Sequence, residues 1–155
     1  MTRPASSASP REVFERVQRA ILDVQMDVYA DLFAADGTFE LPFAPPGIPR
    51  RIEGREAIRA FIRAGAETLR AAPPRWQFRS VVVHQTVDPE VIVTEFEVHG
   101  VAVQGPYQFS NLQVMTVRKG EIVSLRDYWN PLDRPELAAL GKAPLGLQPK
   151  GERTP

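Results

Sequence analysis

The chain has 155 residues, a length typical of one folded domain. Hydrophobic residues make up 43% and charged residues 25%, a balance typical of globular proteins with a packed core. Nineteen basic and nineteen acidic residues cancel, so the chain has no overall charge that would attract nucleic acid or an anionic membrane. The absence of cysteine excludes disulfides, thiolate metal sites and cysteine nucleophiles, and it suits the reducing cytoplasm, where we expect the protein.

The two ends differ in composition from the middle. Residues 1–10 are rich in Ser, Ala and Pro and hold no apolar run, so we expect a disordered tail without a signal peptide or a membrane span. Residues 132–155 contain several prolines and glycines, which disfavour continuous helix or central strand and predict an extended tail. The folded domain is expected over residues 11–131.

The first part of that domain has a helical pattern. Residues 9–12, Ser-Pro-Arg-Glu, form a typical helix start. Apolar residues then recur every three or four positions, at Val13, Val17, Ala20, Ile21, Val24 and Val28. We expect an amphipathic helix of about six or seven turns that is broken near Gln25 and ends before Asp36-Gly37.

A short strand and a second helix should follow. Residues 38–43 alternate weakly between polar and apolar side chains and predict a strand, and the prolines after it predict a rigid loop. Residues 55–62 carry apolar side chains at helical spacing. They predict a helix that starts after Gly54 and ends before the prolines at 73 and 74.

From residue 76 onward the apolar period changes to two. Turn signals at Asp88-Pro89, Gln104–Pro106 and Lys119-Gly120 separate four expected strands, which cover residues 76–86, 91–103, 107–117 and 121–130. Helices followed by an antiparallel meander predict an α+β domain, in which the helices cover one face of a curved sheet and enclose a pocket.

A tight turn at Lys119-Gly120 sets the expected register of the last hairpin. Pairing of Val117 with Ile122 would place Leu112 opposite Asp127. The face around Asp127 would then hold Leu112, Val114, Val123, Leu125 and Trp129, extended by Thr94, Phe96 and Val98. The opposite face would hold Asn111, Gln113, Met115, Arg126 and Tyr128.

Asp127 is the unusual residue of this hairpin. A carboxylate among apolar side chains is costly when ionised, so its pKa should rise, and a raised pKa suits a general acid near neutral pH. Alternatively, Asp127 lies half exposed at the rim of the sheet, or is paired with Arg126, Arg134 or a tyrosine, and has no chemical role.

The other polar residues carry weaker signals. His84 and His99 would lie about 20 Å apart on their strands, which disfavours a shared metal site. Glu40 should point away from its apolar neighbours and be solvated or ion-paired. A cluster of basic residues comprises Arg50, Arg51, Arg55, Arg59 and Arg63. The helical spacing of the last three predicts a solvated stripe rather than an anion site.

Four segments of the chain resemble one known family in their order and spacing. They are Asp31–Gly37 (DLFAADG), Gly54–Ile58 (GREAI), Gly120–Val123 (GEIV) and Arg126–Asn130 (RDYWN). Over about residues 13–131 the chain is similar to the SnoaL-like, ketosteroid-isomerase-like branch of the nuclear transport factor 2-like superfamily. This resemblance implies a cone-shaped, cystatin-like α+β barrel, a deep apolar cavity and a homodimer built through the outer face of the sheet.

Within this superfamily the chain resembles the phenazine biosynthesis A/B proteins, which are acid–base catalysts of condensation or ring formation. The resemblance places Asp127 where their catalytic Glu stands and Tyr107 where a tyrosine lines their cavity. Phe61 and Gly65 stand where their helix carries a histidine and a serine. The resemblance therefore implies a more apolar substrate than a phenazine precursor.

The resemblance to steroid isomerases extends less far into the chemistry. Their catalytic base would fall at Leu41, and their oxyanion-stabilising Asp at Leu112. Only Trp129 fits their pattern of cavity-lining aromatic residues. Acid–base chemistry in this chain would then depend on Asp127.

Two hypotheses follow from the residues and the resemblance. The first is an enzyme without cofactor or metal that moves protons on a planar or polycyclic carbonyl compound, as an isomerase, cyclase or dehydratase of secondary metabolism. Asp127 would be the general acid, and Tyr107 would hydrogen-bond the carbonyl. The substrate-binding wall would comprise Leu41, Phe61, Phe96, Leu112, Val114, Leu125 and Trp129. The second is a non-catalytic ligand-binding or carrier domain of the same fold.

Overall fold

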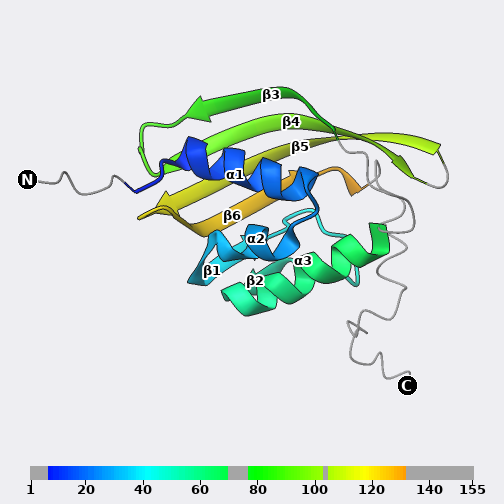
Figure 1. Cartoon of the computed structure of the whole chain (residues 1–155), viewed down its shortest axis with the longest axis horizontal. Coiled ribbons are helices and arrows are strands. Elements are labelled where there is room, and N and C mark those ends of the chain that lie inside the picture. Colours follow the sequence, from blue (N-terminus) through cyan, green and yellow to red (C-terminus); the bar gives the residue numbers. More distant parts are fainter. Residues whose placement is uncertain (1–6, 70–76, 103–104, 132–155) are drawn as a thin grey trace, which may run out of the picture.

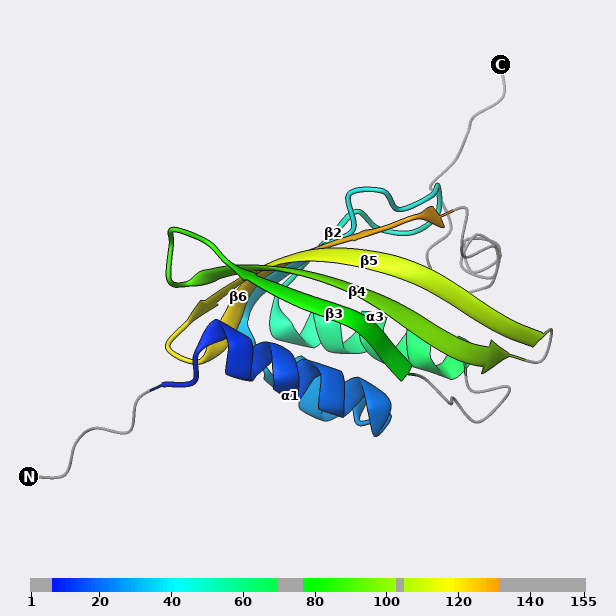
Figure 2. The ribbon, with the colours of Figure 1, turned by 90° about the horizontal axis from the view of Figure 1, so that it is seen from above.

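The computed structural model describes residues 7–69, 77–102 and 105–131. Over this part of the chain, three helices lie on one face of a curved, six-stranded sheet (Figures 1 and 2). The strand order is β2-β1-β6-β5-β4-β3, so β2 and β3 form two edges and the sheet is not closed. The predicted α+β class is confirmed, although β1 runs parallel to β6 and the sheet is therefore mixed.

The helices are α1 (Pro10–Leu22), α2 (Met26–Asp31) and α3 (Arg55–Leu69). The strands are β1 (Phe33–Glu40), β2 (Arg51–Glu53), β3 (Gln77–Gln85), β4 (Val91–Ala102), β5 (Gly105–Arg118) and β6 (Glu121–Trp129). No helix in the described ranges is long and apolar enough to cross a lipid bilayer. The predicted C-terminal tail, 132–155, lies outside the described residues, as does most of the predicted N-terminal one.

α1 starts with a capping box, as its sequence predicts. The Ser9 hydroxyl accepts a hydrogen bond from the backbone N of Glu12, and Glu12 Oε2 accepts one from the backbone N of Ser9 at 2.7 Å. The apolar stripe of the helix buries Val13, Phe14 and Val17. These contacts fix α1 along β3, β4 and β5, on the same side of the sheet as α3 (Figure 2).

The predicted break near Gln25 is confirmed, because α1 ends at Leu22 and α2 begins at Met26. Val24 between them adopts a positive φ of 55°. A right-handed α-helix requires a negative φ, so the helix is interrupted here. The predicted end of the helical pattern, just before Asp36-Gly37, is wrong. The helix ends at Asp31, and β1 begins at Phe33.

Gly37 lies in β1 where that strand comes close to β6. A Cβ atom added to it would lie 2.9 Å from the backbone O of Ile122 and 3.0 Å from that of Ala34. The β1–β6 register is irregular between Phe33 and Thr38, so the close approach falls at a bulge. A residue without a side chain is therefore needed at this position.

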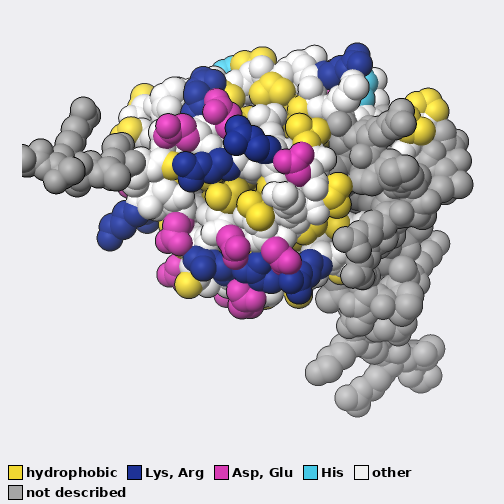
Figure 3. All heavy atoms as spheres, in the orientation of Figure 1, with side chains coloured by type: hydrophobic (Ala, Val, Ile, Leu, Met, Phe, Trp, Pro, Cys, Tyr) yellow, Lys and Arg dark blue, Asp and Glu magenta, His cyan; other side chains and the backbone are white. Residues whose placement is uncertain are grey.

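The second predicted helix is confirmed as α3, whereas the short strand β2 before it was not predicted. Ile52 of β2 pairs with Phe39 of β1, which closes the proline-rich loop. On the outside of α3, Arg59 and Arg63 form ion pairs with Asp27 of α2. Acidic and basic side chains accordingly intermingle over these two helices (Figure 3), and the arginines are not gathered into an anion site.

The register of the last hairpin differs from the prediction. Val117 pairs with Ile122 as predicted, but a bulge follows, so Asp127 lies opposite Gln113 instead of Leu112. Side chains alternate along a strand, so this single-residue shift changes which β5 side chains share a face with Asp127. The β5 residues predicted for the opposite face lie on the same face as Asp127, and those predicted for its own face lie on the opposite one. The face toward the helices, here called the inner face, carries Asn111, Gln113, Met115, Leu125, Asp127 and Trp129. The outer face carries Leu112, Val114, Arg126 and Tyr128.

β3 is an edge strand with an irregularity of its own. Its pairing with β4 shifts between Arg79 and Val82, and Ser80 in this gap has a positive φ of 53°. His99 pairs with Gln77 on one side of the bulge, and His84 pairs with Val93 on the other.

We expect Gly37→Ala to lower the free energy of unfolding by about 1–3 kcal/mol, because β1 and β6 must separate to admit the methyl group. Urea denaturation followed by circular dichroism measures this change. Gly65→Ala is the matched control, since an added Cβ in α3 meets no atom within 4 Å and alanine favours a helix by about 1 kcal/mol over glycine. Equal stability of Gly37→Ala and wild type would contradict the tight contact.

Candidate functional site

A cavity of about 180 Å³ lies between the helices and the inner face of the sheet. Its apolar walls come from both layers and comprise Phe14, Val17, Ile21, Tyr29, Phe39, Phe78, Phe96, Val98 and Phe109. The Phe96 ring packs against Phe14 and Phe78, with ring centroids 5.9 Å and 5.2 Å apart. These rings make a wall that suits a flat, apolar molecule.

The polar part of the cavity is formed by β5 and β6, together with Gln18 of α1. Asp127 is the charged group among the described residues that line it, and Asn111 and Gln113 lie beside it on β5. Asn111 Nδ2 donates a hydrogen bond to Asp127 Oδ1 at 2.7 Å. An amide NH₂ group can only donate, so this carboxyl oxygen acts as an acceptor.

Tyr29 brings a second functional group to the cavity from α2. Burial raises the pKa of the Tyr29 hydroxyl far above its usual value of 10, and the nearby negative charge of Asp127 raises it further. The phenol therefore stays protonated in the folded protein at neutral pH. Tyr29 and Asp127 together place a neutral hydroxyl and a carboxylate in one apolar cavity.

Three buried side-chain oxygens on this face have no hydrogen-bond partner within the described part of the chain. They are Thr94 Oγ1, Asn111 Oδ1 and Gln113 Oε1. The side chains of Asn111 and Gln113 line the cavity, and Thr94 is the cross-strand neighbour of Gln113. Unpaired polar atoms are rare in protein interiors, which makes this cluster the most unusual feature of the inner face.

The structure separates the residues predicted to bind substrate. Asp127 and Phe96 line the cavity. Leu41, Phe61 and Leu125 do not line it: Leu41 and Leu125 are buried in the core. Phe61 on α3 lies behind the cavity wall, with its ring centroid 6.0 Å from that of Phe39.

Leu112, Val114 and Trp129 line a different hollow. The predicted grouping of Leu112 and Val114 with Asp127 is wrong, because the β6 bulge leaves these two side chains on the outer face. Trp129 is buried where β6 ends and lines the same outer hollow. Tyr107 pairs through its backbone with Gly100, but its side chain lies outside the described residues.

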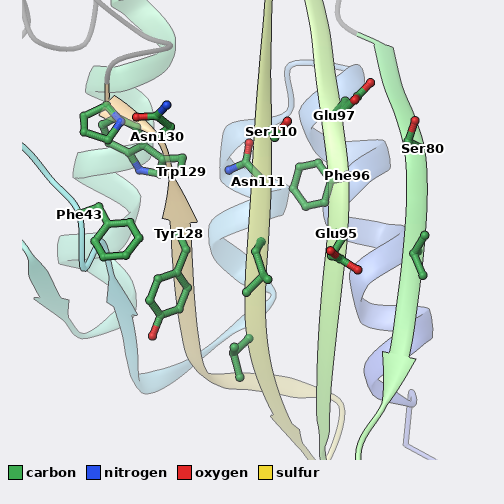
Figure 4. Close-up of a pocket in the computed structure, with 14 residues that line it drawn as sticks. Phe43, Ser80, Glu95, Phe96, Glu97, Ser110, Asn111, Tyr128, Trp129 and Asn130 are labelled. Atoms are coloured by element: carbon green, nitrogen blue, oxygen red, sulfur yellow. The ribbon is translucent and has the colours of Figure 1, made fainter.

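This outer hollow is a groove of about 940 Å³ that crosses β3, β4, β5 and β6. Phe43 and Tyr128 lie side by side at one end of it (Figure 4), with ring centroids 5.5 Å apart. Exposed apolar side chains along the groove include Phe43, Val82 and Leu112. Clustered exposed apolar side chains of this kind are typical of interaction surfaces and ligand-binding grooves.

The remaining polar candidates form pairs away from the cavity. His84 Nε2 lies 2.6 Å from Glu95 Oε2, and His99 Nε2 lies 2.9 Å from Glu97 Oε2, while Glu40 forms an ion pair with Arg51 as expected. Across the ranges that the structure describes, no group of three His, Cys, Asp or Glu side chains could hold a metal ion.

Asn111, Gln113 and Tyr29 were missed as site residues by the sequence reasoning. The predicted register placed Asn111 and Gln113 on the face opposite Asp127, and no site role was assigned to Tyr29. One signal was present: Ile122 and Leu125 are both strongly apolar but three residues apart, which an unbroken strand cannot bury on one face. That spacing indicates a bulge between Ile122 and Leu125, and the bulge places Asn111 and Gln113 on the same face as Asp127.

Comparison with known proteins agrees with this architecture. Residues 12–125 match the model of the SnoaL-like domain family. An uncharacterised PhzA/B-like protein of Pseudomonas aeruginosa, PA3332, is 39% identical over 115 residues, which cover 73% of this chain and 77% of the relative.

Solved structures of other proteins share the fold. A Bacillus subtilis protein described as a "Putative Isomerase" is 30% identical, with a TM-score of 0.73 over 83% of this chain and 91% of its own. Rv0760c of Mycobacterium tuberculosis, solved with estradiol-17beta-hemisuccinate, is 22% identical, with a TM-score of 0.63 over 79% of this chain and 95% of its own. Because the family model covers most of the chain, the protein belongs to the SnoaL-like domain family, within the nuclear transport factor 2-like fold.

Proposed function

We propose that this protein is an enzyme that binds a small carbonyl compound in the inner cavity and moves a proton on it through Asp127. The observation that carries the proposal is the pairing of a carboxylate with a neutral, buried hydroxyl in one apolar cavity. The relative described as an isomerase and the one solved with a steroid derivative support a small-molecule ligand. No cofactor is needed for a proton transfer of this kind, and the lack of cysteine favours a cytoplasmic location.

Asp127 and Tyr29 can together carry out both steps of an isomerisation, the removal of a proton and its return. Asp127 accepts the proton of a C–H bond next to the carbonyl, and the electron pair of that bond moves onto the carbonyl oxygen. The Tyr29 hydroxyl donates a hydrogen bond to this developing oxyanion. Asp127 then returns the proton to another carbon, so the double bond moves and no atom is gained or lost.

Asn111 acts here as a positioning residue. Its hydrogen bond to Asp127 Oδ1 holds the carboxyl group in one orientation. The role of general acid predicted from the sequence becomes the second step of this reaction. Tyr107 remains a predicted carbonyl ligand, and Tyr29 is the donor that the described residues supply.

A non-catalytic carrier is the second candidate function. Phe61 and Leu41 stand where related enzymes place further acid–base groups, and both are packed in the apolar interior. A protein that keeps the fold but lacks these acid–base groups can bind a ligand without reacting.

The outer face is proposed to join two copies of the chain, as the family resemblance implies. Phe43 is 58% exposed and Leu112 is 38% exposed in the outer groove, and such clustered apolar surface is typical of interfaces. A dimer formed there would leave the inner cavities of both copies on opposite sides of the interface.

We expect Asp127→Asn to reduce turnover about 10²- to 10⁴-fold while ligand binding is retained, because the amide cannot carry the proton. The assay is the conversion of small cyclic β,γ-unsaturated ketones to the conjugated isomer, followed by ultraviolet absorption. Asp36→Asn makes the same chemical change at an exposed position of β1 and should keep full activity. Binding without turnover in all three proteins would favour the carrier.

Tyr29→Phe should reduce the alkaline sensitivity of the fold. The folded protein holds the phenolic proton more tightly than the unfolded chain does, so this contribution to stability is complete below about pH 10 and falls above it. Wild type should lose up to about 1.4 kcal/mol of unfolding free energy per pH unit more than Tyr29→Phe between pH 10 and 11.5.

Urea denaturation at several pH values measures both slopes. Tyr128→Phe, which changes a partly exposed tyrosine of the outer face, is the control and should retain the wild-type slope. Identical slopes for wild type and Tyr29→Phe would contradict the burial of a neutral phenol.

Leu112→Glu should dissociate the proposed dimer, raising its dissociation constant at least about tenfold, because a charge would be buried in an apolar contact. Size-exclusion chromatography with light scattering measures the mass. Val87→Glu is the control, since Val87 is fully exposed in a turn away from the groove. A wild-type monomer at micromolar concentration would contradict the proposed interface.

A further inference from the structure

Gln18 differs from the other polar residues of α1. Those residues are all charged and exposed, whereas Gln18 carries a neutral amide and is half-buried. It lies four residues after Phe14 and three before Ile21, within the apolar stripe that faces the sheet. A helix that serves only to cover a core commonly carries an apolar side chain at such a position.

The amide of Gln18 is open to a ligand. Its side chain forms no hydrogen bond with any residue in the ranges that the structure describes. Its oxygen and nitrogen are not sealed from solvent, in contrast to the buried oxygens of Asn111 and Gln113. One acceptor and two donor hydrogens are therefore accessible at this point of the cavity wall.

Gln18 lies at the mouth of the inner cavity. It lines this cavity and also an open hollow of about 530 Å³ on the surface, and Phe78 of β3 lines both as well. The hollow lies between α1 and β3, and its walls comprise Gln18, Leu22, Gln77, Phe78, Arg79 and Val81. Two hollows with shared walls adjoin, so the cavity reaches the surface between α1 and β3.

The reactive groups of the cavity lie on the side away from this mouth. Asp127 belongs to β6, whereas the mouth lies at β3. β5 and β4 separate these two strands (Figure 1), so their axes lie about 14 Å apart along the sheet. The aromatic wall around Phe96 of β4 occupies the interval. The cavity thus has one polar end at Asp127 and Tyr29, an apolar middle and a second polar end at Gln18.

The cation beside the mouth is directed elsewhere. Arg79 pairs with Glu97, which lines the outer groove, so the Arg79 side chain leaves β3 on the outer face. Its Nε and Nη2 both donate to Gln77 Oε1, at 3.2 Å and 2.8 Å. The polar group that faces the cavity at its mouth is therefore the neutral amide of Gln18.

We propose that Gln18 is a ligand-binding residue that forms a hydrogen bond with a hydroxyl group at the end of the ligand remote from its carbonyl. A hydroxyl suits this amide, because it can donate to Oε1 or accept from Nε2. The ligand is an elongated, largely apolar compound, with its carbonyl beside Tyr29 and its hydroxyl at the mouth. That this compound is also the substrate rests on the function proposed above.

Binding of two matched probes to the full-length protein tests this assignment without any turnover. 6-Hydroxy-2-acetylnaphthalene carries a ketone and a hydroxyl at opposite ends of a flat body. 6-Methyl-2-acetylnaphthalene has nearly the same shape without the hydroxyl. Isothermal titration calorimetry gives the ratio of their dissociation constants, and wild type should bind the hydroxyl probe at least about threefold more tightly. Failure of both probes to bind would overturn the elongated ligand.

Gln18→Leu and Gln18→Met remove the amide and keep a side chain of similar size and helix propensity. Both variants should lower the preference for the hydroxyl probe at least about fivefold, because the hydroxyl loses its partner and the methyl group gains an apolar one. Gln108→Leu makes the same change at an exposed glutamine of β5 and should keep the wild-type preference. An unchanged preference in both Gln18 variants would overturn the assignment.

Asp127→Asn tests the orientation of the ligand. It changes the opposite end of the cavity, so the preference for the hydroxyl probe should persist. A preference lost in Asp127→Asn and kept in the Gln18 variants would place the hydroxyl at β6 and overturn the assignment. 6-Acetyl-2-naphthoic acid should bind wild type more weakly than the hydroxyl probe, and tighter binding would overturn the neutral mouth.

These outcomes are independent of the isomerase assay. A preference that depends on Gln18 in a protein without turnover would support the assignment and make the protein a carrier of such compounds. Turnover with a preference that does not depend on Gln18 would remove only the present inference.

Discussion

The irregular pairing of β5 and β6 near their turn determines which side chains share the inner face. Ile122 and Leu125 are both fully buried although they are three residues apart, and only an inserted residue allows this in a strand with alternating side chains. Beyond the insertion, Asp127 faces the helices and lies opposite Gln113. The acid, its amide partner and the unpaired oxygens all owe their common location to this bulge.

The cavity is held open at the expense of stability. A hollow among aromatic side chains and unpaired buried oxygens both reduce the free energy of folding. The dense part of the core offsets this cost, since Phe33, Ile58 and Ile92 are fully buried. Binding sites are commonly maintained in this way by a well-packed remainder of the domain.

Most of the fold could be predicted from the sequence, because hydrophobic period, capping residues and turn signals are local properties. The capping box at Ser9 and the turn at Lys119-Gly120 are examples. The site was harder to predict from the sequence, because the residues that form it depend on a one-residue shift in strand pairing. No local sequence pattern fixes that shift. For this reason the predicted pairing of Asp127 with Leu112 was wrong. The role of Tyr29 depends on the depth of burial, which a helical stripe does not reveal.

The bulge at Ser80 has a consequence for how the protein behaves at high concentration. β3 is an edge strand, and an edge with a long, regular row of free amide and carbonyl groups can pair with a strand of another molecule. The positive φ of Ser80 and the register shift beside it interrupt that row and twist the strand. We therefore expect the kink to make β3 a poor template for the edge-to-edge pairing that lets sheets grow into fibres.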